Sequence, residues 1–195
     1  MSNIFWLKDL PNTFTLKKGE KKDIFFFHTG NLDSFNLKIN LFGEYASFNL
    51  YGAIFLKGNQ KANLQTYTFH KSPSTFARIN IKAVLTQRAE FNFTGMIDIG
   101  AKAFYADSYL QQDNLVLSDD VICNTSPQLE IKANDVKASH GATVGSIEPT
   151  HLYYLQSRGL DYKKAVSLIS EGFLSSVFAD KKDLVLKELS LKKFI

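Results

Sequence analysis

The feature that most constrains this sequence is a two-residue alternation of apolar and polar side chains, which recurs from about Thr13 to Ile147. Its clearest stretch contains Phe35, Leu37, Ile39 and Leu41, with polar residues between them. The same parity returns at 79–81 and 91–99, and in shorter pieces at 115–117 and 129–131. Successive side chains of a β-strand point to opposite faces, so this pattern predicts strands with one buried face.

Turn-forming residues separate these runs, so that strand centres recur roughly every 10 to 15 residues. The turn signals are Gly30-Asn31, Gly43, Gly58-Asn59, Ser72-Pro73, Asp119-Asp120 and Ser126-Pro127. No helix-length segment lies between them, which predicts an all-β body. The spacing by itself is compatible with a sandwich, a barrel or a β-solenoid, and the residues show no crisp repeat.

The period changes after Glu148, where helical signals replace the alternation. Pro149 suits the first position of a helix that stops at Gly159, and Asp161 suits the N-cap of the next helix. An amphipathic stripe then follows, made of Ala165, Leu168, Ile169, Gly172, Phe173 and Val177. We therefore expect a β core over 1–147 and a helical segment over 148–195 that is too short to be an independent domain.

A third helix is predicted near the end of the chain. Asp180 is its expected cap, and Leu184, Val185 and Leu189 would form its apolar side, with a lysine-rich outer face.

Composition excludes several classes of protein. Hydrophobic residues make up 45% of the 195 residues, too many for a disordered chain. No apolar run approaches the roughly 18 residues of a membrane-spanning helix. One cysteine cannot form an intrachain disulfide, so we expect a reducing compartment and a cytoplasmic protein. The net charge of +4 comes mainly from scattered lysines interrupted by acids, which favours a solvated surface over a nucleic-acid interface.

The sequence has no self-contained catalytic or nucleotide site. It lacks a phosphate-binding loop and a dinucleotide fingerprint, and its four histidines form no zinc-binding pair. Asp119 and Asp120 are expected to be turn residues. A polysaccharide-acting enzyme would need clustered carboxylates, whereas the acids here are scattered.

Two side chains could still bind a metal. Cys123 is a candidate soft ligand, although a lone cysteine beside Val121 and Ile122 is more often a small buried apolar residue. His140 lies among small residues in the segment Lys137–Gly145, which leaves its ring clear of bulky neighbours. It is either satisfied inside a strand or a ligand at an exposed edge.

Several motifs in sequential order resemble the SufB/SufD family of iron–sulfur cluster assembly proteins. They are Leu115-Val116-Leu117-Ser118-Asp119, Pro127-Gln128-Leu129-Glu130-Ile131, Asn134-Asp135-Val136-Lys137, Ser139-His140-Gly141-Ala142-Thr143-Val144-Gly145 and Tyr153-Tyr154-Leu155-Gln156-Ser157-Arg158-Gly159-Leu160. The match runs from about Tyr109 to Phe173. The S-H-G-A-T form resembles the SufD branch, because the SufB branch has a glutamate where Gly141 stands. The SufB-type cysteine would fall near Gln112, and a cysteine common in SufD-type proteins is replaced by Ala138.

The resemblance implies a mainly β fold, a right-handed parallel β-helix (β-solenoid) followed by a C-terminal α-helical segment, in a short, core-only family member. It also implies a non-catalytic scaffold subunit that docks a SufC-type ABC ATPase through its helices and pairs with a SufB-like subunit or a second copy of itself. The expected cofactor is a transient iron–sulfur cluster, present only in the complex, with no nucleotide bound by this chain. No nucleic-acid or membrane partner is expected.

The resemblance also assigns candidate residues. His140 would be a cluster ligand at the subunit interface, and Cys123 is a weak second candidate. The expected partner-binding residues on the helices are Tyr153, Tyr154, Arg158, Gly159, Leu168 and Phe173. The alternative interpretation is a structural or regulatory SufD-like module that binds the ATPase but has lost cluster chemistry.

Overall fold

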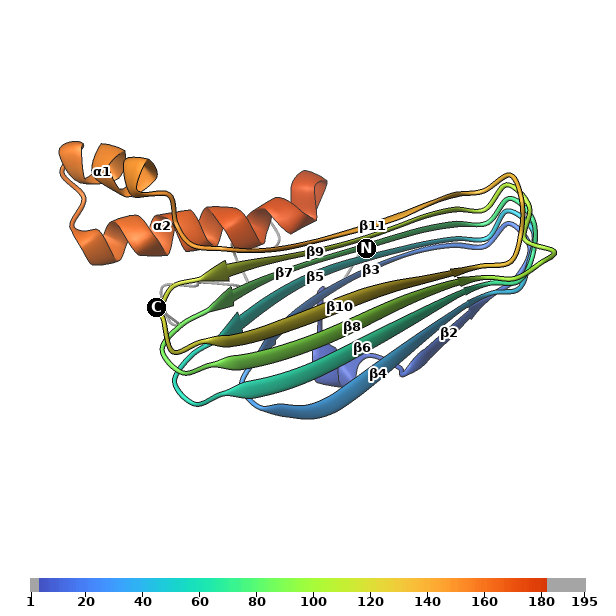
Figure 1. Ribbon diagram of the computed structural model, residues 1–195, viewed down its shortest axis with the longest axis horizontal. Helices are drawn as coiled ribbons and strands as arrows, with labels where there is room; N and C mark the ends of the chain where they lie inside the picture. Colours follow the sequence, from blue (N-terminus) through green and yellow to red (C-terminus); the bar gives the residue numbers. More distant parts are fainter. Residues whose placement is uncertain (1–3, 182–195) are drawn as a thin grey trace.

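The computed structural model describes residues 4–181, which form a long β body with helices at one side (Figure 1). The strands are β1 (Ile4–Trp6), β2 (Thr13–Leu16), β3 (Lys21–Thr29), β4 (Leu32–Leu41), β5 (Ser47–Leu56), β6 (Lys61–His70), β7 (Phe76–Leu85), β8 (Glu90–Ile99), β9 (Asp107–Val116), β10 (Ile122–Ile131) and β11 (Lys137–Gly145). The helices are the 3-10 helix η1 (Leu7–Asp9), α1 (Pro149–Ser157), α2 (Tyr162–Ser175) and the 3-10 helix η2 (Ser176–Lys181).

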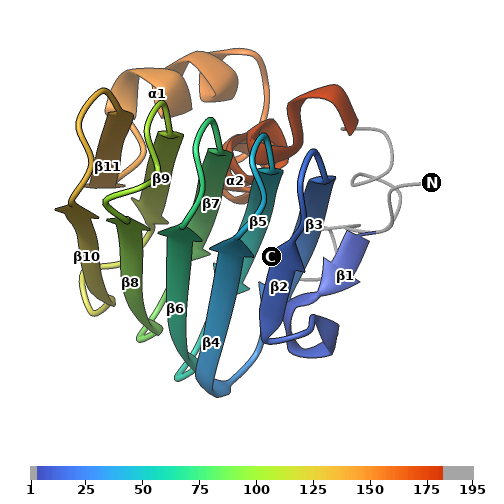
Figure 2. The ribbon, with the colours of Figure 1, turned by 90° about the vertical axis from the view of Figure 1, so that its right-hand side faces the viewer.

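Successive strands from β2 onward alternate between two sheets, so the chain winds as a right-handed coil (Figures 1 and 2). Sheet A has the order β1-β3-β5-β7-β9-β11, and sheet B has the order β10-β8-β6-β4-β2. Neighbouring strands within each sheet pair in parallel. This arrangement is a β-solenoid, which confirms the fold that the family resemblance implied and decides among the three all-β architectures.

Because apolar and polar residues alternate, every second side chain of a strand points into the interior of the coil. A representative interior column crosses sheet A through Ile24, Leu50, Ile79 and Leu110, which are in register and buried. The expected apolar parity of β8 is also confirmed, because Phe91, Phe93, Ile97 and Ile99 are all buried. Burial of these columns is the main source of stability for the coil.

Two details of the interior depend on single residues. Gly52 leaves space for the ring of Phe26 on the preceding coil, since a Cβ at position 52 would lie 2.2 Å from a ring carbon. His70 is fully buried, and its Nδ1 lies 2.8 Å from Thr75 Oγ1. Burial lowers the pKa of His70 to about 4, so the ring is neutral near pH 7.

A second, smaller core covers the outer face of sheet A. Phe25 and Phe27 point away from the interior and pack, through this core, with Leu174, Val177 and Phe178 of α2 and η2. This contact explains why the continuous apolar run in β3 breaks the alternation: both faces of that strand are buried.

The predicted helix signals are confirmed locally. Pro149 is the first residue of α1, Gly159 follows that helix with φ of 90°, and the Asp161 side chain caps α2 by accepting from the Lys164 N–H at 2.8 Å. Asp119 and Asp120 lie in the turn between β9 and β10, as expected.

One part of the predicted helical stripe is wrong. Leu168 is 50% exposed, whereas Ala165 is fully buried. The buried side of α2 is placed differently from the predicted stripe, because the buried residues of this helix are Ala165, Ser170 and Leu174, while Ile169 and Phe173 are only partly buried. The apolar residues of the predicted third helix lie outside the described residues, and Asp180 itself belongs to η2.

Within residues 4–181, no helix is both long enough and apolar enough to cross a bilayer.

Candidate functional site

The coil ends in two unpaired strand edges. β10 is the last strand of sheet B, and β11 is the last strand of sheet A. Within residues 4–181, no strand pairs with the outer side of either one. Long exposed edges offer main-chain N–H and C=O groups to another chain. Figure 2 shows both strands at the same end of the solenoid, which we call the open end.

His140 lies at this open end, on the interior-facing side of β11. It is in register with Leu110 of β9, whose side chain is fully buried inside the coil. His140 is nevertheless exposed, because no further coil within residues 4–181 covers it. Its neighbours on the same face are Ala138 and Ala142, so small side chains flank the imidazole. Of the two positions that the sequence left open, the structure therefore shows an exposed edge.

Cys123 lies on the other edge strand, β10, in register with the buried Phe91. It is half-buried and packs against the interior core. Burial raises the pKa of the Cys123 thiol to about 11, so the protonated form dominates near neutral pH. The geometry therefore agrees with the interpretation of Cys123 as a small, largely apolar side chain.

An amide pair lies directly beneath the open end. Gln112 and Asn114 point into the coil from β9 and are buried. The Gln112 Nε2 donates to Asn114 Oδ1 at 2.5 Å, and the Asn114 Nδ2 donates to the Thr143 carbonyl at 3.0 Å. Sequence reasoning missed this pair, although polar residues at buried-parity positions of β9 were the available signal. Gln112, near which the cysteine of SufB-type proteins would fall, is instead an amide that is already hydrogen-bonded to Asn114.

The outer face of the same two strands carries a polar network beside Gly141. Gln111 donates to Asp113 through Nε2, and the Thr143 hydroxyl donates to the same Asp113 oxygen at 2.8 Å. A Cβ at Gly141 would lie 2.3 Å from Gln111 Oε1. Gly141, where the SufB branch has a glutamate, therefore leaves space for the end of the Gln111 side chain on the neighbouring strand.

The helices present a separate exposed surface. Tyr153 is 75% exposed and Tyr154 is 57% exposed on α1. The Arg158 guanidinium lies 5.3 Å from the centre of the Tyr154 ring, a cation–π contact that orients both side chains. Gly159 is also exposed. Apart from Leu168 and Phe173, described next, these are the residues predicted to bind a partner.

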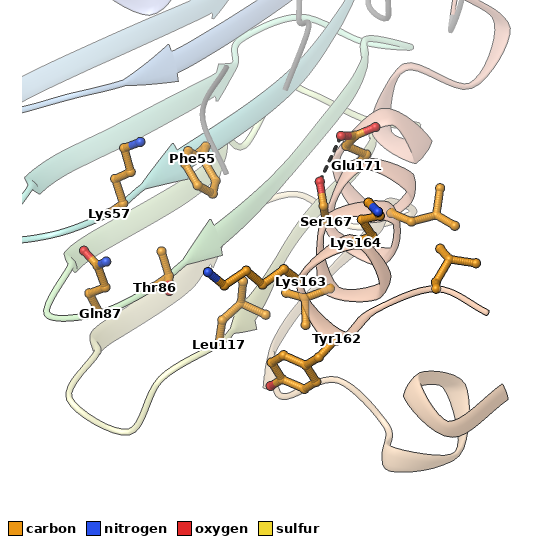
Figure 3. A pocket seen from close by; sticks show the side chains of 13 residues that line it. Phe55, Lys57, Thr86, Gln87, Leu117, Tyr162, Lys163, Lys164, Ser167 and Glu171 are labelled. Atoms are coloured by element: carbon orange, nitrogen blue, oxygen red, sulfur yellow. Dashed lines mark hydrogen bonds between the residues drawn. The ribbon is translucent and has the colours of Figure 1, made fainter. Parts of the chain in front are cut away.

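Leu168 borders a groove between α2 and the turns of the coil, with a volume of about 880 Å³ (Figure 3). Phe55 and Leu117 contribute apolar lining, and Figure 3 shows the Lys163 side chain reaching from α2 toward the turn that holds Thr86. Phe173 differs from the other predicted residues, since it packs in the second core with Lys82 Nζ 4.7 Å from its ring centre.

The predicted metal residues do not come together as a complete site. Among the described residues, no group of three or more histidine, cysteine or acidic side chains could hold a metal ion. His140 and Cys123 lie on different edge strands of the open end.

Comparison with known proteins places the chain in a family. Residues 18–173 match the family model described as "SUF system FeS cluster assembly, SufBD core domain". The iron-sulfur cluster assembly protein SufD of Escherichia coli K12 is 29% identical over 158 residues, which cover 81% of this chain and 37% of that protein. SufD of Bacillus subtilis 168 is 31% identical over 138 residues, covering 71% of this chain and 32% of that protein.

A more distant relative is the chloroplastic SufBD family protein ABCI8 of Arabidopsis thaliana, which is 27% identical over 136 residues, 70% of this chain and 24% of that protein. The chain thus spans between 24% and 37% of the length of these relatives. The solenoid, the open end and the matched residues lead to one conclusion: this chain belongs to the SufBD core-domain family of the SUF iron–sulfur cluster assembly system.

Proposed function

We propose that this chain is a non-catalytic, SufD-like scaffold subunit of a SUF-type assembly complex. The observation that carries the proposal is the open end, where no described strand pairs with the outer sides of β10 and β11, and where His140 is exposed on the interior-facing side. Unpaired edges of this length are a liability unless another chain covers them. A SufB-like subunit that pairs with β10 and β11 would close the coil and bury the end.

His140 would then offer its imidazole to a cluster held between the two subunits. Imidazole ligation of iron–sulfur clusters is chemically established. Cys123 is a poor second ligand, because burial raises the pKa of its thiol to about 11. The partner would therefore supply the remaining ligands, and the cluster would be the transient cargo of the complex.

The helical segment is the proposed docking surface for a SufC-type ATPase. Tyr153, Tyr154 and Leu168 expose apolar area on two adjacent helices, which favours a protein partner. α2 is packed against β5 and β7 through the second core, so a force on the helices reaches the coil as a rigid-body displacement. Nucleotide-driven movement of the ATPase could thereby open or close the subunit interface.

One observation favours a second candidate, a structural module that docks the ATPase without cluster chemistry. The side chains of Gln112 and Asn114 hydrogen-bond to each other beneath the open end, and Ala138 leaves His140 as the sole imidazole or thiolate on its face of β11.

A cytoplasmic location stays a prediction, and one relative is named as chloroplastic.

The first test is anaerobic co-expression with a SufC-type ATPase and a SufB-type subunit, followed by size-exclusion chromatography with light scattering. We expect a stable ternary complex. A chain that binds neither partner would overturn the scaffold assignment.

Val144→Lys tests the open end, because Val144 is 53% exposed and lies on the same face as His140. It should abolish pairing with the SufB-type subunit, whereas Ser139→Lys, on the opposite face of β11, should not.

The role of His140 is tested in the assembled complex. His140→Ala should lower the cluster yield of the anaerobically purified complex without changing subunit stoichiometry, measured by iron content and visible absorbance. Ser139→Ala is the matched control on the same strand. Unchanged cluster yield with His140→Ala would favour the structural module over the scaffold with a cluster ligand.

A further inference from the structure

An aromatic surface lies on the turns that lead from sheet B to sheet A. Figure 1 shows these turns at the right-hand end of the solenoid, opposite α1. The turn before β5 carries Phe42 and Tyr45, and the turn before β9 carries Phe104 and Tyr105, all of them exposed. We call these residues the aromatic corner. Large aromatic side chains that gather on an exposed surface are typical of interaction sites.

The two tyrosines have a backbone conformation that disfavours bulky side chains. Tyr45 has a φ of 61° and Tyr105 has a φ of 59°, both in the left-handed region. Each lies two residues before a strand of sheet A, as Gly19 does in the first coil with a φ of 69°. A tyrosine in this region costs stability that a glycine would not. Tyr45 is 61% exposed and Tyr105 is 69% exposed, so burial does not offset that cost, which favours a role in binding.

The turns stack from coil to coil, which sets the spacing between the tyrosines. The Tyr45 N–H donates to the Pro73 carbonyl at 3.4 Å, and the Ser74 N–H donates to the Phe104 carbonyl at 2.8 Å. Ser74 thus has the equivalent position on the middle coil, with a φ of 54° and a small side chain. Neighbouring strands of a sheet are about 4.8 Å apart, so two coils separate Tyr45 from Tyr105 by about 9.6 Å.

This spacing matches the repeat of a polyproline II helix. That helix has three residues per turn and rises by about 3.1 Å per residue, so equivalent side chains recur about every 9.3 Å. Its main-chain carbonyls form no internal hydrogen bonds and can accept from a protein. Among residues 4–181, the hydroxyl groups of Tyr45 and Tyr105 take part in no hydrogen bond. Each can therefore donate to a ligand carbonyl while its ring packs against a proline.

We propose that the aromatic corner binds a proline-rich segment of another protein in the polyproline II conformation. Successive turns of the segment contact the coils of Tyr45 and Tyr105 and cross the smaller Ser74 between them. An α-helix satisfies its own carbonyls and has no use for the two hydroxyl donors. An added strand is disfavoured, because main-chain groups of these turns are already hydrogen-bonded from coil to coil. The corner lies away from α1 and from the open end, so this inference is independent of the proposed function.

The test measures binding of labelled decaproline to the full chain by fluorescence polarisation, with a flexible Gly-Ser peptide of equal length as the control ligand. Decaproline should bind and the flexible peptide should not. Tyr105→Asn removes one ring but introduces a side chain that the left-handed conformation accepts, so it should weaken decaproline binding about tenfold. Asp135→Asn introduces the same amide at the equivalent position of the last coil, where φ is 54°. It should change binding less than about twofold.

Two further measurements separate binding from stability. Tyr105→Asn should leave the melting temperature unchanged or raise it by up to about 4 °C, because it relieves backbone strain at an exposed position. Tyr105→Phe keeps the ring and loses the hydroxyl donor, so it should weaken binding by only about threefold. Tyr45→Asn should match Tyr105→Asn in both measurements, because the two tyrosines are equivalent anchors.

Four outcomes would contradict the proposal. Equal binding of both peptides, or no binding at about 1 mM decaproline, would overturn the choice of a proline-rich ligand. Unchanged binding in Tyr105→Asn would overturn the site itself. A melting temperature lowered by several degrees in Tyr105→Asn would show that the tyrosine is retained for the fold. Self-association that is lost in Tyr105→Asn, measured by sedimentation of the chain alone, would assign the corner to a second copy instead.

Discussion

The middle coils and the last coil of this protein have matching interior positions in register, but the residue types and their burial at these positions differ. Phe93 of β8 is buried in the core, whereas Thr125, its neighbour on β10, is only partly buried. Leu110 of β9 is fully buried, whereas His140, its neighbour on β11, is exposed. Interior positions that carry large apolar residues in the middle therefore carry smaller or polar ones at the open end.

This difference shows how a repetitive fold separates stability from interaction. Each middle strand is covered on both sides, so its inward residues are selected by packing. The last strands are covered on one side only, and a large apolar residue there would stay exposed in the free chain. The open end can therefore carry groups that act on a partner at small cost to the stability of the coil.

The largest expected effect contrasts the two regions directly. Phe93→Ala should lower the free energy of unfolding by about 3–5 kcal/mol, because it leaves a cavity in the closed core. Thr125→Ala, at the matching position on β10, should cost less than about 1 kcal/mol. Denaturant titrations of the two variants measure both values. Similar losses would contradict the idea that the last coil contributes little to stability.

The second prediction concerns pH. The pKa of His70 is about 4 in the folded chain against 6.5 for a free histidine, so the unfolded chain binds more protons between those values. The stability due to the neutral ring is fully present above pH 6.5 and is lost as the pH falls toward 4, by roughly 3 kcal/mol. Burial also lowers the pKa of His28, which adds to the same trend.

Unfolding free energies at pH 7 and 4.5 test this linkage. His70→Asn should flatten the dependence, because the buried ring of His70 is then replaced by a side chain that does not titrate. A dependence that survives His70→Asn at full size would show that other groups cause it.

The smallest effects come from two glycines. Gly52→Ala places a Cβ 2.2 Å from the Phe26 ring inside the middle coils and should cost about 1–3 kcal/mol through overpacking. Gly145→Ala meets nothing within 4 Å at the end of β11 and should change stability by less than about 0.5 kcal/mol. Melting temperatures of the two variants give the comparison. A neutral Gly52→Ala would mean that the Phe26 ring can move aside.

The strands could be predicted because alternation is a local property. The alternation in β8 predicted which of its faces is buried without any knowledge of strand pairing, through the shared parity of Phe91, Phe93, Ile97 and Ile99. Pro149 and Asp161 marked helix starts for the same reason, since caps involve residues only a few positions apart. The choice of a solenoid over a sandwich or barrel did not follow from spacing, and only the family resemblance implied it.

Features that depend on register or packing were decided by the tertiary structure. The position of the buried stripe on α2 was predicted wrongly at Leu168, because the surface on which the helix packs determines which of its residues are covered. Gln112 and Asn114 are polar residues on the buried face of β9, where apolar residues were expected. Hydrogen bonds between the side chains of Asn63, Asn92 and Asn124 join residues that are distant in sequence. Their alignment follows from the parallel register of successive coils.

The sequence by itself therefore determined the strands, their buried faces, the helix caps and the candidate histidine. The tertiary structure decided that His140 lies on an exposed edge, that Cys123 is half-buried, and that β10 and β11 have no partner on their outer sides among the described strands. The physical reason is the range of the interactions. Side-chain alternation and capping act within a few residues, whereas edges, ladders and burial exist only once the coils have stacked.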